Sequence, residues 1–171
     1  MKTKAAIANG KGSFFIGEID VADPVGDEVL VQIKAAGICH TDWDSLNWGK
    51  QIVMGHEGAG IVTKIGPEVK SLRPGDKVIL NWAIPCHHCF QCEQGNLHIC
   101  EINSSVTNGN EISGGHASFE STIYNNSPIE RSFNIGTMSG YTLVREAATV
   151  KYEIEIPFSS ASIVSCGVMT G

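Results

Sequence analysis

Four cysteines in the middle of the chain form the pattern C-x2-C-x2-C-x7-C, made by Cys86, Cys89, Cys92 and Cys100. Four thiolates this close in sequence can surround one tetrahedral Zn²⁺ at about 2.3 Å per bond. A site closed by four sulfurs leaves no position for a substrate. The pattern therefore predicts a structural zinc site in a lobe over residues 84–102. The metal would order a segment that has few apolar residues of its own.

Disulfides and an iron–sulfur cluster are the alternatives for this pattern. No signal peptide is recognisable in residues 1–10, and no apolar run reaches the roughly 18–20 residues that span a bilayer. We therefore expect a cytoplasmic protein, in which six cysteines favour metal over disulfides. C-x2-C-x2-C also opens bacterial ferredoxin runs, which continue x3-C-Pro. Here seven residues intervene and Glu101 follows Cys100.

The two remaining cysteines, Cys39 and Cys166, lie far apart in sequence, and His56 stands in Gly-His-Glu-Gly. Each of these residues has an ordinary alternative, since a lone cysteine is usually a small buried hydrophobe. Together, two thiolates and one imidazole with water as the fourth ligand predict a second zinc site. An open coordination position lets zinc polarise an oxygen and lower its pKa.

Two acidic residues belong to this second hypothesis. Asp42 is expected to orient His56 through its other ring nitrogen or to cap a helix N-terminus, and the two roles are compatible. Glu57 is expected to be an extra ligand or a buried charge that balances the site. The other histidines are expected to be surface or hydrogen-bonded residues and not metal ligands: His40, His87, His88, His98 and His116.

Charge argues against nucleic acid as a partner. The formal net charge is −6, and no lysine or arginine occurs between Lys77 and Arg131. A segment without fixed positive side chains does not hold a phosphate backbone.

Glycine content and hydrophobic periodicity favour a mainly β fold with short helices. Nineteen glycines indicate many tight turns. Residues 28–36 alternate, with Val29, Val31 and Ile33 on one face and Glu28 on the other, and Leu30 breaks the pattern. Further strands are expected at 2–8, 14–19, 59–65, 76–80, 140–144 and 148–151. Helices are expected at 42–48 and 158–164, and residues 103–128 are expected to form an irregular loop, with room for short strands.

Taken together, the motifs resemble the N-terminal catalytic domain of a zinc-dependent alcohol dehydrogenase of the medium-chain dehydrogenase/reductase family. The resemblance covers essentially all of residues 1–171. Besides the four-cysteine lobe, it is carried by Gly-Ile-Cys-His-Thr-Asp at 37–42, Gly-His-Glu-Gly-Ala-Gly at 55–60, Gly-Asp-Lys-Val at 75–78 and Ser-Cys-Gly-Val-Met-Thr-Gly at 165–171.

This resemblance implies a GroES-like (chaperonin-10-like) β-barrel with two zinc ions per full-length subunit. It implies catalytic zinc on Cys39, His56 and Cys166, and structural zinc on the four-cysteine lobe. In the family an alcohol binds zinc as an alkoxide and passes hydride to NAD or NADP, giving an aldehyde or ketone. The resemblance also implies a small-molecule alcohol or aldehyde substrate, no membrane partner and a homo-oligomeric full-length protein.

Residue roles follow from the same resemblance. Thr41 would relay the alcohol's proton, while Asp42 and Glu57 would lie beside the metal and its ligands. His40 would lie near the cofactor pyrophosphate, and Thr170 next to the nicotinamide.

Several features depart from the family pattern. Asp44 occupies a position where many members have a histidine that ends the proton relay. The segment between Cys39 and His56 is short, and it contains Trp43 and Trp48, which would line the substrate pocket or pack in the core. No G-x-G-x-x-G follows a strand. We therefore expect a truncated chain, missing the nucleotide-binding domain and nearly inactive alone. A non-catalytic, zinc-stabilised β-barrel that binds a partner is the alternative function.

Overall fold

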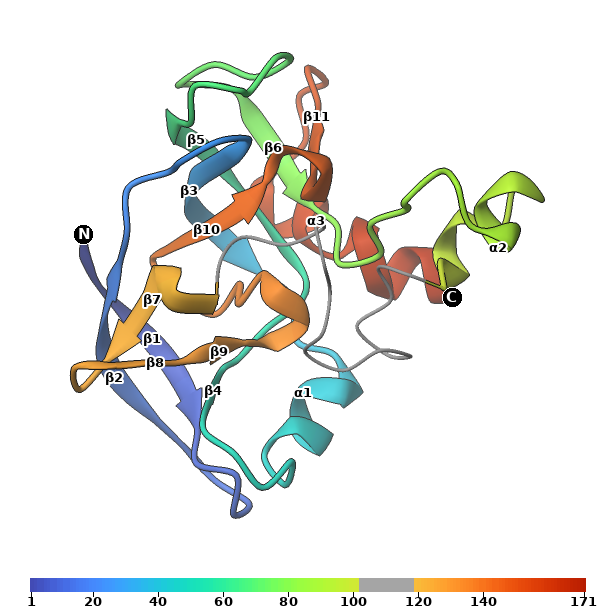
Figure 1. Cartoon of the computed structure of the whole chain (residues 1–171). Coiled ribbons are helices and arrows are strands. Elements are labelled where there is room, and N and C mark those ends of the chain that lie inside the picture. The colour runs from blue at the N-terminus through green and yellow to red at the C-terminus, as the bar shows by residue number, and fades with distance from the viewer. Residues whose placement is uncertain (102–118) are drawn as a thin grey trace.

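Two β-sheets make up most of the protein in a computed structural model that describes residues 1–101 and 119–171 (Figure 1). The first sheet has the order β8-β7-β2-β1-β4-β9 and the second has the order β10-β3-β5-β6-β11. All neighbouring strands are antiparallel except β4 and β9. The strands are β1 (Lys2–Ala8), β2 (Phe14–Val21), β3 (Glu28–Ala36), β4 (Ile52–Val53), β5 (Gly58–Ile65), β6 (Lys77–Leu80), β7 (Thr122–Tyr124), β8 (Ser127–Pro128), β9 (Glu130–Arg131), β10 (Tyr141–Arg145) and β11 (Thr149–Lys151).

The helices are short. They are α1 (His40–Ser45), α2 (Phe90–Glu93), α3 (Phe158–Ser162), the π-helix η5 (Val164–Val168), and the 3₁₀ turns η1 (Leu97–Ile99), η2 (Phe119–Ser121), η3 (Ser132–Asn134) and η4 (Glu146–Ala148). The lobe that carries α2 projects from the body of the molecule (Figure 1). No helix in the described ranges combines the length and apolar character needed to cross a membrane.

The break in the alternation at Leu30 follows from the position of β3 between two cores. Val29 and Val31 are buried in a cluster with β5 and β6, whereas Leu30 is buried against residues of the first sheet such as Ile7 and Ile19. The first half of β3 is therefore covered on both faces. Glu28, predicted on the polar face, is buried for the same reason, and its Oε2 accepts the backbone N–H of Val25 at 3.0 Å.

The β1–β2 hairpin shows how the sequence makes one of the turns. The Asn9 side-chain oxygen accepts the backbone N–H groups of Lys11 at 2.8 Å and Ser13 at 3.1 Å. Gly10 has φ +72°, and a Cβ there would lie 2.4 Å from the Lys50 backbone nitrogen. Only glycine meets both requirements without strain.

The predicted mainly β class and its strands are present, with ends shifted by one or two residues. The first helix is a correction, because it spans His40–Ser45 and not residues 42–48. Cys39 is its N-cap, so the helix begins directly after this candidate ligand, in the connection that follows β3. The second helix ends at Ser162 and is followed by η5. Of the predicted loop, residues 103–118 lie outside the described residues, and the remainder contains β7 and β8.

Candidate metal centres

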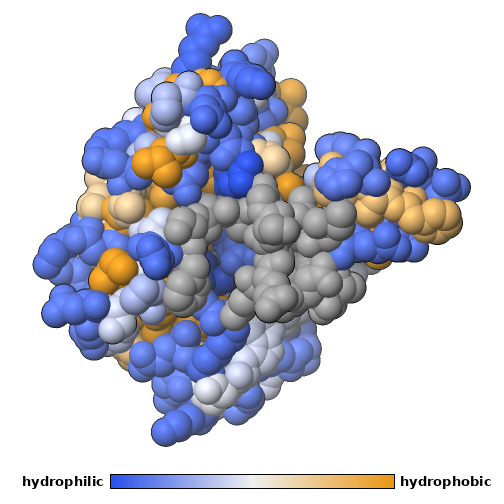
Figure 2. Space-filling model, viewed as in Figure 1, coloured by the Kyte–Doolittle hydropathy of each residue, from blue (hydrophilic) through white to orange (hydrophobic). Residues whose placement is uncertain are grey.

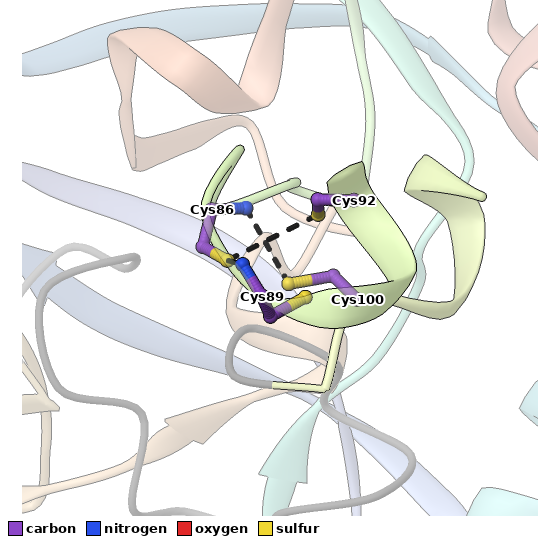
Figure 3. Close-up of side chains that lie close together, drawn as sticks. All are labelled: Cys86, Cys89, Cys92 and Cys100. Carbon is purple, nitrogen blue, oxygen red and sulfur yellow. Dashed lines mark hydrogen bonds between the residues drawn. The ribbon is translucent and has the colours of Figure 1, made fainter. Parts of the chain in front are cut away.

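The four lobe cysteines converge on one point from a helical turn and the loops around it (Figure 3). Their sulfurs all lie within 4.8 Å of one another. The Cys86 and Cys92 sulfurs are 4.0 Å apart, close to the roughly 3.8 Å between ligands of a tetrahedral zinc with 2.3 Å bonds. The donor set and its spacing therefore fit the structural zinc that the sequence predicts.

Backbone N–H groups point at these sulfurs. Cys89 donates to Cys86 Sγ at 3.3 Å, and Cys86 donates to Cys100 Sγ at 3.4 Å. Backbone hydrogen bonds from Cys92 lower the pKa of Cys89 to about 6, while burial raises the pKa of Cys92 to about 11. A divalent cation bound among these thiols would favour the thiolate form of all four.

The lobe has little other support. Among the described residues, its own buried cluster consists of Cys89, Cys92 and Cys100 with Cys86 packed against them. Phe90, Leu97 and Ile99 are exposed, and Figure 2 shows apolar surface on this projection. Metal ligation would therefore add strongly to the few buried contacts that the described part of this segment makes.

The second group joins three distant parts of the chain. Cys39 precedes α1, His56 and Glu57 precede β5, and Cys166 lies in η5. Their ligand atoms lie within 4.8 Å of one another. His56 and Glu57 are buried and the two cysteines are partly buried. The structure thus brings together the residues that sequence spacing and resemblance selected; their role as ligands stays a prediction.

Asp42 connects two of these residues. Its Oδ2 accepts the backbone N–H of Cys39 at 2.9 Å, and its Oδ1 lies 3.1 Å from His56 Nδ1. Asp42 is 2% exposed and occupies the third position of α1, so the prediction of Asp42 as N-cap residue is corrected. The contact occupies Nδ1 and leaves Nε2 of His56 for a metal.

Charge in this group is unevenly shared. Burial raises the pKa of Cys39, but hydrogen bonds from Thr41 and His56 outweigh it and leave a net lowering. Burial lowers the pKa of His56, but the hydrogen bond and charge of Asp42 outweigh it and leave a net rise. Burial, together with Cys39 and Glu57, raises the pKa of Cys166 to about 11. A bound cation would reverse this last shift, because a thiolate is the ligating form.

The position of the Glu57 side chain requires a glycine at residue 37, which lies against it. An added Cβ at Gly37 would lie 2.0 Å from Glu57 Oε2, so any larger residue would displace the carboxylate. The Gly37 backbone N–H donates to the Glu57 carbonyl at 3.1 Å. The carboxylate is therefore held within the group of candidate ligands, as an extra ligand or as a balancing charge.

Sequence reasoning missed an aromatic cluster beside His56. The ring of Phe133 lies 4.9 Å from His56, 5.2 Å from Trp82 and 6.0 Å from Trp48, measured between centroids. Phe133 has φ +49° and Asn134 has φ +60°, a left-handed pair that turns the ring toward the imidazole. No motif marks Phe133 or Trp82. Asn134 and Gly136, which follow Phe133 closely, indicate only a turn.

The remaining predicted residues lie near the outside. Thr41 Oγ1 lies 3.8 Å from Cys39 Sγ. His40 is exposed, and its Nε2 lies 3.7 Å from Asp44 Oδ1 across one helical turn. Thr170 and Trp43 are exposed. The exposure of Trp43 corrects the core-packing alternative for that residue, whereas Trp48 joins the aromatic cluster.

The fold and the two candidate centres define a class: a barrel-like β domain with one closed four-thiol group and one mixed group of two thiols, an imidazole and a carboxylate. The profile of the family described as "Alcohol dehydrogenase GroES-like domain" matches residues 26–154. The chain belongs to this family, which confirms the predicted fold class.

Known proteins of this family are similar over the whole chain. Alcohol dehydrogenase B of Mycobacterium tuberculosis (strain ATCC 25618 / H37Rv) is 34% identical, with 100% of this chain and 46% of that protein covered. S-(hydroxymethyl)glutathione dehydrogenase of Paracoccus denitrificans is 33% identical, with 100% and 47% covered. The chain thus spans about half the length of the curated relatives it matches.

Two crystal structures show the same fold. A benzyl alcohol dehydrogenase from Acinetobacter calcoaceticus superposes with a TM-score of 0.83 at 33% identity, covering 100% of this chain and 46% of that one. An alcohol dehydrogenase zinc-binding domain protein from Burkholderia ambifaria gives 0.86 at 31% identity, covering 99% and 47%.

Proposed function

We propose that this chain is the zinc-binding catalytic domain of an NAD(P)-dependent alcohol dehydrogenase. The observation that carries the proposal is the convergence of Cys39, His56 and Cys166 beside Glu57. Two thiolates and one imidazole with an open position are the ligand set of catalytic zinc in alcohol dehydrogenases. A purely structural role would not need this second group, because the four-cysteine lobe already supplies a closed site.

A bound zinc would act as a Lewis acid that polarises the oxygen of an alcohol or carbonyl and lowers the pKa of a hydroxyl. The chain's own residues prepare the site for it. Asp42 accepts the Nδ1 proton of His56 and so orients Nε2. The partly buried sulfurs and the carboxylate of Glu57 supply negative charge, and Thr41 places a hydroxyl beside Cys39 for proton transfer.

The aromatic cluster would form one wall of the substrate site. The ring of Phe133 covers His56 on one side, and Trp48 and Trp82 extend the apolar surface. The Trp82 Nε1–H is buried and has no partner among the described residues. Such a wall excludes water and favours an apolar substrate. His40 and Thr170 are proposed to meet the cofactor, to which their exposed side chains are open.

Metal content tests the proposal directly. The purified chain should hold about two zinc ions, one for each group, when analysed by plasma mass spectrometry. Cys39→Ser should retain the lobe zinc and lose the other, and Cys100→Ser should do the reverse. In a protein that joins this chain to a nucleotide-binding domain, Cys39→Ser should also abolish alcohol-dependent reduction of NAD(P)⁺. A single zinc, unchanged by Cys39→Ser, would instead support a zinc-stabilised binding module.

A further inference from the structure

A shallow groove of about 300 Å³ opens where the two sheets part, and neither metal group contributes to its lining. One wall comes from β1 and β2, and the other comes from the end of β3. The floor is the segment Thr137–Ser139. A volume of this size is at the lower end for small-molecule sites in proteins.

Backbone hydrogen bonds explain why the groove exists. The Gly140 carbonyl accepts Ile33 N–H from β3 at 3.0 Å, and Gly140 N–H donates to the Lys4 carbonyl in β1 at 2.9 Å. The segment before Gly140 then follows β1 alone, since the Met138 carbonyl accepts Ala6 N–H at 2.8 Å. The rest of β3 has no such bond to this segment, and the space between them is the groove.

The charged side chains that line it among the described residues are both positive. Lys4 and Lys34 line the groove from opposite walls, and none of the acidic residues in 1–101 and 119–171 lines it. Neither lysine forms an ion pair with any described residue, whereas most other lysines do. Glu18 pairs opposite Lys4 in the β1–β2 register, but its carboxylate is bonded to Lys2 at 3.2 Å.

Between the lysines the surface is apolar with one polar feature. Ala6, Ile16 and Ile33 line it, and Ile16 is 62% exposed, although it lies in a strand beside the core. Thr137 is completely buried beneath, and its hydroxyl has no hydrogen-bond partner among residues 1–101 and 119–171. Apolar walls between two cations that form no ion pair with a described residue suit a ligand that has an aliphatic part and a negative head.

We propose that this groove binds a small aliphatic carboxylate, with its head between Lys4 and Lys34 and its chain against Ile16 and Ile33. The site is separate from the proposed metal centre and goes beyond the dehydrogenase function. Its floor is nevertheless linked to that centre, because Thr137 N–H donates to the Gly55 carbonyl at 3.0 Å, one residue before His56. A bound carboxylate would therefore sit behind a ligand-bearing segment.

Hexanoate is the probe for this proposal. Titration into the isotope-labelled, zinc-loaded chain should give saturable shifts in the amide resonances of residues 4–6, 33–36 and 137–139. The double variant Lys4→Gln/Lys34→Gln should raise the dissociation constant of hexanoate at least about fivefold. This is the loss of affinity expected when two exposed ion pairs are removed. 1-Hexanol, which has the same chain without the charge, should bind more weakly by a similar factor, as should inorganic phosphate.

Lys11→Gln/Lys70→Gln is the matched control, because it removes the same charge from two exposed lysines outside the groove. It should bind hexanoate as the natural sequence does. Equal weakening in both double variants would overturn the proposal, since binding would then reflect net charge. Shifts confined to residues around Cys39, His56 and Cys166 would also overturn it, because the carboxylate would then be a metal ligand. The absence of saturable binding would overturn it as well. If sedimentation then showed a dimer, this face would instead be assigned to contact with a second copy of the chain.

Discussion

Among single residues, Asp42 makes the two contacts on which the second centre most depends. Its carboxylate fixes the backbone of Cys39 and the imidazole of His56 at once, although these residues come from different loops. Asp42→Asn keeps the size of the side chain but loses the negative charge. We expect zinc affinity at this centre to fall about 10–100-fold, the usual effect of losing a hydrogen-bond partner of a metal ligand.

Chelator competition with a zinc-sensitive dye measures this affinity, and the lobe zinc serves as an internal reference. Asp44→Asn is the control, because Asp44 lies in the same helix but its side chain is 58% exposed and faces His40. An unchanged affinity in Asp42→Asn would show that the contact orients nothing.

Sequence could identify residues of this kind only where chemistry limits the choice. The sequence predicts Cys39, His56 and Cys166 as one group because few side chains ligate zinc and the six cysteines divide into four and two, and the structure places the three side chains together. The sequence does not predict Phe133, because its ring is placed beside His56 by a left-handed backbone conformation that no local sequence pattern predicts. Leu30 breaks the alternation in the sequence, and the reason lies in tertiary structure, because β3 runs between two cores.

At the scale of elements, the Glu146 side chain connects two loops by hydrogen bonds. Its carboxylate accepts the backbone N–H groups of Lys70 and Ser71 and the Ser71 hydroxyl at 2.6–3.1 Å, which joins the β5–β6 connection to the turn after β10. Burial raises the pKa of Glu146, but the hydrogen bonds from Ser71 and Lys70 outweigh it and leave the pKa below its ordinary value of 4.5.

The sign of the pH effect follows. A carboxylate whose pKa is lowered by folding stabilises the protein above its unfolded-state pKa, and that contribution is lost as pH falls through the folded-state pKa. Glu146→Gln should therefore reduce the free energy of unfolding by about 1 kcal/mol at pH 7. The difference between the two proteins should shrink as pH falls below 4.5. Urea unfolding at a series of pH values measures it, and a difference independent of pH would contradict the assignment.

The cysteine lobe is an element held by its metal. Cys100→Ser should release that zinc and expose the backbone amides of Cys86 and Cys89, which donate to cysteine sulfurs. Hydrogen exchange should become fast across residues 86–100 and stay slow in β3 and β5, because these strands belong to a separate core. Exchange that rises equally in β3 would show that the lobe supports the barrel.

Secondary-structure elements could be predicted best where the local sequence pattern alone determines them. The hairpin strands and β3 follow from alternation and turn residues, and their ends were placed within two residues. The two-residue strands β4 and β9 were missed, because β4 pairs with β1 and β9, which are distant from it in sequence, and both strands are too short to show a period. The first helix was placed too late, because its N-cap is a cysteine and not a usual capping residue.

For the whole molecule, the two metal groups should differ in what they stabilise. The lobe ligands span fifteen residues, whereas Cys39 and Cys166 lie 127 positions apart and come from opposite ends of the described fold. A cation bound by both closes a long loop and holds η5 and the neighbouring α3 beside β3 and β5, strands that α3 also contacts. Zinc at this centre should therefore stabilise the native barrel, and zinc at the lobe should act locally.

Thermal unfolding with buffered free zinc separates the two effects. At a free zinc concentration about 100 times the dissociation constant, binding to the native state adds about 2.7 kcal/mol, or about 5–10 °C in melting temperature for a chain of this size. Cys166→Ser should lose this rise in the barrel signal, whereas Cys100→Ser should keep it, and with chelator present Cys166→Ser and the natural sequence should melt together. If Cys166→Ser responded to zinc as strongly as the natural sequence, the late cysteine would not be a ligand and the barrel would be closed by packing of α3 alone.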